Sequence, residues 1–347
     1  MRIVIATDAW HPQVNGVVRS IEAMAKAARP LGAEVEFLTP EGFASVSMPT
    51  YPDIQLAFAT SPAVARRMAD LKPDHIHIAT EGPIGLATRH YCRRAGLVFT
   101  TSYHTQFPDY IAARAPIPKR LTFAALRWFH NGSAGTMVST GSIERELTAN
   151  GFRNLMRWSR GVDHDMFKPR AMSVLDLPRP IFLSVGRVAV EKNVEAFLSL
   201  DLPGSKVVVG DGPAREDLQA RFPDVTFLGM QTGETLAAIY ASADVFVFPS
   251  RTDTFGIVLL EALASGLPVA AYPVPGPNDV IGDSDVGVLD ENLELACRKA
   301  LTVARDKARA FALRFTWTES ARQFLNNVML ARSASPQPLA QRISDVA

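Results

Sequence analysis

Short apolar runs alternate with longer amphipathic segments along the whole chain. In the first half the runs have the length of buried strands, and segments with a helical period, such as Val17–Arg29 and Ser61–Leu71, lie between them. The strands predicted in this half are Arg2–Ala6, Val35–Leu38, His75–Ala79, Val98–Ser102 and Thr136–Ser139. Alternation of strand and helix is typical of a parallel sheet with crossover helices.

The same alternation repeats in the second half. Its predicted strands are Ile181–Val185, Lys206–Val209, Val225–Leu228, Val245–Phe248, Pro268–Ala271 and Val286–Leu289. Its predicted helices include Glu191–Leu200, Glu234–Ala241 and Gly256–Ser265. We therefore expect an α/β protein of two doubly wound, Rossmann-like domains.

The domain boundary is expected in Val162–Pro180, which has no clean period and carries three prolines. This places the N-terminal domain at 1–168 and the C-terminal domain at 169–317. A last amphipathic helix is predicted at 318–332, followed by a polar tail at 333–347. A chain of 347 residues is long enough for two such cores.

Charge narrows the classes of partner. The net charge is +1, which disfavours a protein that coats nucleic acid, yet residues 1–168 are net +5 and residues 169–347 net −4. From Gly82 to Ile143, seven basic residues stand against one acid, which suggests an anionic surface or substrate on that side.

Cys92 and Cys297 are too far apart along the chain for a metal cluster or a disulfide framework. With no apolar stretch of membrane-spanning length and no signal peptide, we expect a cytoplasmic protein, in at most peripheral contact with the membrane.

Ligands of parallel sheets bind at the carboxyl ends of strands, so the residues that follow each strand carry the candidate chemistry. After the first strand, Asn15-Gly16 opens a helix where a phosphate could approach backbone N–H groups. After Ile181–Val185, Arg187 and Lys192 bring two cations to one helix start. Such a pair can neutralise a departing diphosphate without a metal.

The most specific segment runs from Phe248 to Gly266. Asp253 lies in the loop after a strand, Gly256 starts a helix, and Glu261 stands inside that helix among apolar residues. A partly buried carboxylate needs partners, and ribose hydroxyls would serve. The loop acid is placed to accept hydrogen bonds from a sugar.

These motifs resemble retaining glycosyltransferases of family 4, which have the GT-B fold. The resemblance rests on an acid, seven residues and then Glu261, together with Gly186-Arg187, Glu191-Lys192-Asn193, Gly210-Asp211-Gly212-Pro213, Arg160-Gly161-Val162-Asp163 and Asn15-Gly16-Val17 in the family's order. It covers about Met1 to Gln323. It implies an active site in the cleft between the domains, with the acceptor on the first and the nucleotide sugar on the second. It also implies that the terminal helix crosses back to the first domain.

The resemblance assigns roles residue by residue. Gly16 would meet the donor by its backbone, Arg187 and Lys192 would hold the diphosphate, and Glu261 would bind the ribose. Asp253 would bind sugar hydroxyls, assisted by the backbone of Thr254, Phe255, Gly256 and Ile257. The family often has Glu where this chain has Asp253, and the shorter arm would shift the sugar.

Ser102–Tyr110 is similar to the His-Thr loop of the family's mannosyl- and lipid-glycosylating branches. This similarity places His104 near the anomeric carbon, as a hydrogen-bonding group rather than a nucleophile. His75 and His77 lie within a strand and are expected to be structural.

The segment Ile111–Phe129 sets basic residues among apolar ones. A basic amphipathic stretch can lie on an anionic bilayer and bring a lipid acceptor to the site, or it can be a buried helix with a solvated face. We favour the membrane. The residues assigned to this surface are Tyr110, Lys119, Arg120, Arg127 and Trp128.

The resulting hypothesis is a retaining, metal-independent hexosyltransferase with no cofactor. Its donor would be of the GDP-mannose or UDP-glucose type, and its acceptor a lipid such as a diacylglycerol or phosphatidylinositol. The alternatives are the same transfer to a soluble glycan, a nucleotide-sugar epimerase of the same fold, and a binding protein without activity. The pairs Asp163/Asp165 and Asp283/Asp285 are interpreted as loop acids rather than metal ligands, and Arg215 disfavours a dinucleotide fingerprint at Gly210.

Overall fold

A computed structural model of the chain describes all residues except 13–15, 49–50, 113–116 and 334–347, and at 47–48, 51–55, 109–110 and 112 it describes the backbone alone. It divides into two compact units. Unit 1 comprises Met1–Ser159 and Trp317–Ala347, and unit 2 comprises Arg160–Thr316. The first segment of unit 1 ends at Ser159, nine residues before the domain boundary at residue 168 that the sequence predicts. The last helix belongs to unit 1.

Unit 1 is built on a parallel sheet with strand order β2-β1-β5-β6-β7-β8. Its strands are β1 (Arg2–Ala6), β2 (Glu34–Leu38), β5 (His75–Ile78), β6 (Phe99–Tyr103), β7 (Gly135–Val138) and β8 (Leu155–Arg157). Its helices are α1 (Gly16–Ala28), the 3₁₀ turn η1 (Arg29–Leu31), α2 (Ser61–Leu71), α3 (Pro83–Arg94), α4 (Phe107–Ala112), α5 (Lys119–His130), α6 (Gly141–Ala149) and α14 (Trp317–Ser333). An antiparallel hairpin of β3 (Ser45–Met48) and β4 (Tyr51–Ala57) stands apart from this sheet.

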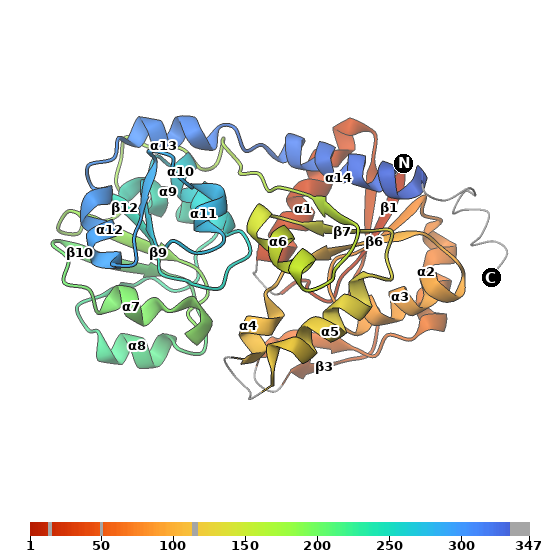
Figure 1. Ribbon diagram of the computed structural model, residues 1–347. Coiled ribbons are helices and arrows are strands. Elements are labelled where there is room, and N and C mark those ends of the chain that lie inside the picture. The colour runs from red at the N-terminus through yellow and green to blue at the C-terminus, as the bar shows by residue number, and fades with distance from the viewer. Residues whose placement is uncertain (13–15, 49–50, 113–116, 334–347) are drawn as a thin grey trace. The chain divides into compact units, whose positions relative to one another are not determined.

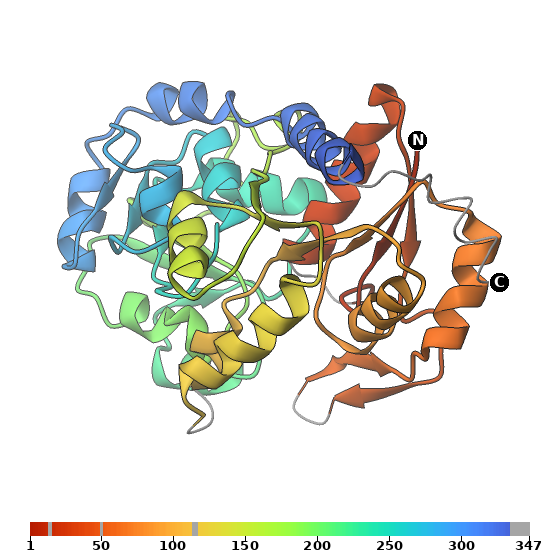
Figure 2. The same cartoon turned by 45° about the vertical axis from the view of Figure 1, so that its right-hand side comes forward.

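The central strands of unit 1, β1, β5, β6 and β7, are buried because helices cover both faces of the sheet. On one face Ile3 and Ile5 of β1 pack with α1 and α14, which Figures 1 and 2 show side by side. Trp158, fully buried, packs on Phe324 of α14 and donates its ring N–H to Ser320 at 3.1 Å. On the other face Val4 and Ala6 of β1 pack with α2 and α3.

Unit 2 is a second parallel sheet, with strand order β11-β10-β9-β12-β13-β14. Its strands are β9 (Ile181–Val185), β10 (Ser205–Val209), β11 (Thr226–Phe227), β12 (Val245–Phe248), β13 (Val269–Ala271) and β14 (Gly287–Leu289). Its helices are η2 (Val190–Lys192), α7 (Val194–Leu198), α8 (Arg215–Arg221), α9 (Gly233–Ser242), α10 (Ile257–Ala264), α11 (Pro277–Val280), α12 (Leu293–Ala300) and α13 (Arg305–Ala312).

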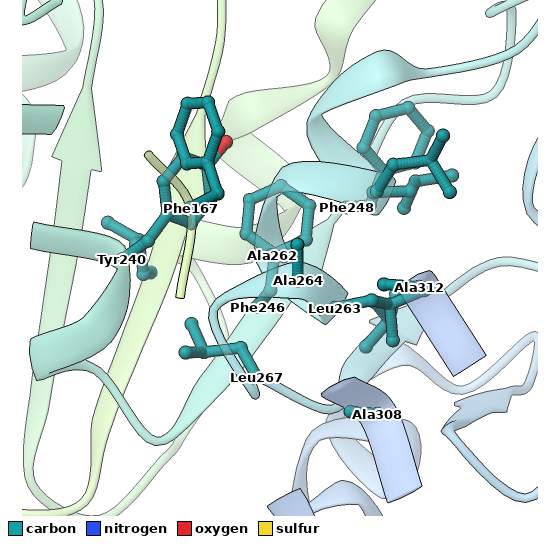
Figure 3. Close-up of a cluster of buried hydrophobic side chains, with 14 of the residues drawn as sticks. Phe167, Tyr240, Phe246, Phe248, Ala262, Leu263, Ala264, Leu267, Ala308 and Ala312 are labelled. Atoms are coloured by element: carbon teal, nitrogen blue, oxygen red, sulfur yellow. The ribbon is translucent and has the colours of Figure 1, made fainter. Parts of the chain in front are cut away.

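The largest core of unit 2 lies between its sheet and helices α9, α10 and α13. Figure 3 shows Phe246 and Phe248 of β12 close to the α10 residues Ala262 and Leu263, with Ala308 of α13 nearby. A separate cluster fills the opposite face, under α7, α8 and α12. The expectation of two doubly wound α/β units is confirmed, and the predicted strands match the observed ones within a residue or two.

In each sheet the order in which successive strands are added reverses at one point. In unit 1 the order runs outward from β1 to β2 on one side and from β5 to β8 on the other, so the change falls between β1 and β5. In unit 2 it falls between β9 and β12. The carboxyl ends of such a strand pair leave a crevice where ligands of these folds bind.

Candidate active site

The loop after β9 carries Arg187 and Lys192. The predicted single helix over 191–200 is wrong, because the chain forms the 3₁₀ turn η2 and then α7, separated by Asn193. Asn193 has a left-handed backbone (φ 53°), a conformation that asparagine tolerates better than most residues. Lys192 thus ends a 3₁₀ turn rather than lying in the first turn of an α-helix, and Arg187 is exposed in the segment before it.

The loop after β12 leads into α10 through Gly256. This glycine has φ 78°, and a Cβ on it would lie 3.1 Å from both Leu259 and Phe248. A residue with a side chain is therefore strained there. Phe255 is buried beneath the loop, and Thr254 and Ile257 lie on either side of this turn. The backbone expected to assist sugar binding is thus held in a fixed course at the start of α10.

The structure brings Lys192 and Asp253 into contact. Lys192 Nζ donates to Asp253 Oδ1 at 2.5 Å, and both side chains are largely buried. Two further bonds join the same loops: Asn193 Nδ2 donates to the Pro249 carbonyl at 3.1 Å and Thr252 Oγ1 donates to the Glu191 carbonyl at 3.2 Å. The loops that follow the neighbouring strands β9 and β12 are therefore tied together by three hydrogen bonds.

The second carboxylate oxygen of Asp253 differs from the one that Lys192 contacts. Its Oδ2 atom is buried and has no hydrogen-bond partner within the parts of the chain that the structure describes. A buried carboxylate oxygen without a donor is costly, so a ligand hydroxyl is the natural partner for it.

Glu261 is buried, as its apolar neighbours predict. It is 2% exposed within α10, and the hydroxyl of Tyr240 on α9 donates to its Oε2 atom at 3.1 Å. Tyr240 is fully buried and packs against Phe246, so its ring is held rigidly behind the carboxylate. Sequence analysis did not single out this tyrosine, which the helical period marks only as a core residue.

Arg251 is a second residue that sequence analysis missed. Its guanidinium lies 3.6 Å from the centroid of the Tyr272 ring and donates to Glu291 at 3.0 Å. These contacts fasten the middle of the loop that carries Asp253 to the segments after β13 and β14. An arginine two residues before the loop acid was the available signal.

The first loop of unit 1 contains Asp8, a carboxylate with a structural role. Asp8 accepts hydrogen bonds from the Thr80 hydroxyl (2.8 Å) and from the backbone N–H groups of Ile84 (2.7 Å) and Gly85 (3.2 Å), and so caps α3. Burial raises the pKa of the Asp8 carboxyl, and the negative charge of Glu81 adds to the rise, whereas these hydrogen bonds lower it. Gly16 begins α1, and a Cβ there would meet open space, so its backbone is accessible; Asn15 lies outside the described residues.

His104 directly follows β6, at the carboxyl edge of the first sheet. Its ring stands edge-on to Trp158, with centroids 5.7 Å apart. His75 and His77 are buried inside β5 and share the hydroxyl of Thr100, at 2.9 and 2.8 Å. Burial lowers the pKa of His75 to about 3, aided by the charge of Arg332. It is neutral near pH 7, as a structural histidine would be.

Helix α5 presents an exposed face that is both apolar and basic. Leu121 and Trp128 are 57% and 60% exposed and lie two turns apart on one side of the helix. The exposed residues at its N-terminal end are Ile117, Pro118, Lys119 and Arg120. We call Ile117–Leu121 with Trp128 the α5 surface.

Not every base counted in this region is available to a membrane. Arg89 is buried, donates to the carbonyls of Trp128 and Phe129 and stacks on the Trp128 ring at 3.8 Å, so it fixes the end of α5 to α3. Arg127 is exposed but donates to the Asn150 carbonyl at 2.9 Å. The side chain of Tyr110 and the whole of Arg114 lie outside the described residues.

Two family models match the chain in order along its length. One, described as Glycosyltransferase Family 4, matches residues 14–166, and the other, Glycosyl transferases group 1, matches residues 179–312. A GDP-mannose-dependent alpha-mannosyltransferase of Mycobacterium tuberculosis is 32% identical, with 83% of each chain covered. The chain belongs to glycosyltransferase family 4. It is a retaining glycosyltransferase that moves a sugar from a nucleotide donor.

Two other relatives of this family 4 chain differ in what they make. An alpha-monoglucosyldiacylglycerol synthase of Streptococcus pneumoniae is 27% identical, covering 88% of this chain and 79% of the synthase. A sulfoquinovosyl transferase of Arabidopsis thaliana is 32% identical, and the match covers 79% of this chain but only 60% of the plant protein.

Solved structures agree on the fold. A sucrose-phosphate synthase from Thermosynechococcus elongatus superimposes with a TM-score of 0.80 at 20% identity, over 96% of this chain and all of that one. An Anabaena protein solved with UDP and glucose gives 0.72 at 15% identity, over 95% and 99%. The GT-B fold predicted from the motifs is thereby confirmed.

The described residues include neither a cluster that could hold a metal ion nor a helix that could cross a membrane. No three His, Cys, Asp or Glu side chains gather there as a metal site would require. Of the acid pairs considered, Asp163 caps its own turn by accepting from the N–H groups of Asp165 and Met166, and Asp285 pairs with Lys307. None of the described helices is long and apolar enough to cross a bilayer.

Proposed function

We propose that this family 4 enzyme transfers a hexose from a sugar nucleotide of the GDP-mannose or UDP-glucose type to a hydroxyl group of a membrane lipid. The observation that supports the sugar-nucleotide donor is the Lys192–Asp253 pair, which joins the loops after β9 and β12. In this pair a cation lies beside a carboxylate that has one oxygen without a donor among the described residues, an arrangement that suits a diphosphate and a sugar hydroxyl.

Each residue then has a task in the reaction. Arg187 and Lys192 neutralise the diphosphate as the glycosidic bond breaks, which stabilises the developing charge. Asp253 accepts a sugar hydroxyl through Oδ2, next to the backbone of Thr254, Phe255, Gly256 and Ile257. The remaining assignments are Glu261 to the ribose, the Gly16 backbone to the donor and His104 to the neighbourhood of the anomeric carbon.

Two observations support a lipid acceptor. The printed name of the Streptococcus relative describes a glucosylated diacylglycerol as its product. The α5 surface combines exposed Leu121 and Trp128 with Lys119 and Arg120, a combination that suits an anionic bilayer. A mannose donor is supported by the printed name of the Mycobacterium relative.

The donor and acceptor are tested with purified enzyme, radiolabelled GDP-mannose and UDP-glucose, and a membrane lipid extract. We expect one donor to yield a labelled lipid whose anomeric configuration matches that of the donor. Because Arg187 and Lys192 occupy the place of a metal, EDTA should leave most of this activity. Complete loss in EDTA with rescue by Mg²⁺ or Mn²⁺ would contradict the diphosphate assignment, and release of an isomerised free sugar would indicate an epimerase.

The α5 surface predicts reversible binding to anionic vesicles. Each basic residue near such a surface contributes about 1 kcal/mol, so reversing Lys119 and Arg120 to glutamate should weaken binding about thirtyfold or more. Vesicle flotation at low and high salt measures this, and wild-type binding should fall as salt screens the charges.

A matched pair on another helix of the same unit provides the control. Arg66 and Arg67 are consecutive, exposed basic residues of α2, so Arg66→Glu/Arg67→Glu makes the same change in net charge away from the α5 surface. Equal loss of flotation in both variants, or wild type that ignores anionic vesicles, would contradict docking through α5.

A further inference from the structure

A buried histidine and a glutamate meet at the carboxyl edge of the first sheet, outside every role assigned so far. His130, the last residue of α5, is fully buried. Its Nε2 atom lies 3.0 Å from Glu81 Oε1, and its Nδ1 atom lies 3.0 Å from Thr101 Oγ1. Both ring nitrogens are therefore engaged, and the ring cannot turn without losing two hydrogen bonds.

The partners decide the roles of the two nitrogens. A carboxylate can only accept, so the Nε2 atom of His130 carries a proton and donates it to Glu81. The other ring nitrogen, Nδ1, is hydrogen-bonded to the hydroxyl of Thr101, which lies in β6. Thr101 is itself 3.1 Å from the hydroxyl of Thr136 in β7. The Glu81 carboxylate is thus oriented by a chain of buried side chains that reaches across two neighbouring strands.

Glu81 stands at the point of unit 1 where ligands are expected. It follows β5, next to the loop after β1, and these two strands flank the change of direction in the sheet. His104 follows β6, the neighbouring strand on the other side. Glu81 and His104 therefore follow neighbouring strands at the same edge of the sheet.

One oxygen of Glu81 remains available. Its side chain is 11% exposed, and its Oε2 atom makes no hydrogen bond to any residue that the structure describes. Asp8, the neighbouring carboxylate, differs in this respect, because it is fully used in holding Thr80 and the start of α3.

A purely structural purpose does not account for this arrangement well. A backbone carbonyl would satisfy His130 Nε2 without adding a charge. The Glu81 charge instead works against Asp8, whose pKa it helps to raise. A charged side chain held in a defined orientation, at the edge where ligands of such parallel sheets bind, suits a recognition site.

We propose that Glu81, oriented by His130, accepts a hydrogen bond from a hydroxyl of the acceptor next to the one that is glycosylated. This rests on the proposed function. The preferred acceptor is then a lipid whose head group carries several hydroxyls, such as a sugar or polyol, over a diacylglycerol with its single free hydroxyl. Two neighbouring carboxylates also repel phosphate, so the part of the head group that Glu81 contacts is uncharged.

The test compares two acceptors in mixed micelles: octyl glucoside, which has several hydroxyls, and dioctanoylglycerol, which has one. Glu81→Gln keeps an oxygen for His130 and removes the charge. Because a hydrogen bond to a charged group is stronger than a neutral one, KM for octyl glucoside should rise about tenfold or more. The kcat for octyl glucoside, the KM for dioctanoylglycerol and the acceptor-free release of nucleoside diphosphate should stay within about twofold of wild type.

His130 provides a conservative pair of variants. His130→Gln can still place an N–H near Glu81 and should retain a near-native KM, whereas His130→Asn is too short to reach and should reproduce the effect of Glu81→Gln. Glu34→Gln is the control, since Glu34 pairs with Arg2 at the opposite edge of the same sheet. It should change neither KM nor kcat. Melting temperatures of all variants separate lost recognition from lost folding.

The outcomes are distinct. A selective rise in KM for octyl glucoside in Glu81→Gln and His130→Asn, with a near-native KM in His130→Gln, supports the inference. Equal effects of Glu81→Gln on both acceptors, no effect on either, or a wild type that glycosylates dioctanoylglycerol alone would overturn it while the proposed transfer stands. A wild type that transfers sugar to neither micellar acceptor nor any lipid of the membrane extract would contradict the proposed function itself, and the inference with it.

Discussion

Replacing Lys192 with alanine is expected to lower turnover by about 10²-fold or more, and by more than replacing Arg187. A fixed cation that faces developing negative charge is worth this much in other enzymes. Lys192 has a second task that Arg187 lacks, since it holds Asp253 Oδ1 at 2.5 Å. On the proposed assignment, its loss removes a cation from the diphosphate and frees the carboxylate that is assigned to the sugar. Initial rates at saturating donor, with both alanine variants side by side, measure the difference.

The fold should survive the Lys192 substitution. Leaving a largely buried carboxylate without its partner costs about 1–3 kcal/mol, which is less than the stability of a typical domain. A second lysine–aspartate pair of the same length serves as the control: Lys307 and Asp285 also lie 2.5 Å apart, but both are exposed. Exposed pairs contribute little, so Lys307→Ala should leave turnover and stability nearly unchanged. Near-native turnover in Lys192→Ala and Arg187→Ala would show that another group neutralises the diphosphate.

The order of elements was predictable from the sequence because most strands of this fold are buried on both faces. Runs such as Ile181–Val185 and Val245–Phe248 are apolar throughout, and the structure gives them the predicted bounds. The hairpin β3/β4 was missed because Pro49 and Pro52 interrupt its pattern, and prolines usually mark the absence of a strand. The three-residue edge strand β8 was too short to give a period.

The contacts of the site were less predictable than its residues. Lys192 and Asp253 were both identified from the ends of strands, but their ion pair depends on β9 and β12 being neighbours, which the order of elements along the chain does not reveal. The break at Asn193 also has a tertiary cause, since its side chain bonds the Pro249 carbonyl. Glu81 follows a strand just as His104 does, and the same rule applied to β5 would have found it.

Asp253→Asn is expected to separate sugar transfer from nucleotide binding. Asparagine fills the same space but loses the charge, so a sugar hydroxyl that donates to Oδ2 would lose its strongest acceptor. We expect turnover to fall by about 10²-fold or more. Lys192, no longer paired with a carboxylate, becomes more available to phosphate, so the affinity for the nucleoside diphosphate should stay the same or increase. Calorimetric titration of GDP and UDP, beside rates with the full sugar nucleotide, measures both effects.

Nucleotide affinity should respond differently to Lys192→Ala and to Asp253→Asn, and this difference distinguishes a shared donor site from a structural ion pair. If the pair only holds the loops together, both substitutions should weaken nucleotide binding and lower the melting temperature by similar amounts. If it divides the donor between phosphate and sugar, nucleotide affinity falls in the first and is kept in the second. Asp253→Glu completes the series, because a carboxylate on a longer arm can still accept the hydroxyl and should retain part of the activity that asparagine loses. A glutamate variant as inactive as Asp253→Asn would mean that the position of the carboxylate matters more than its charge.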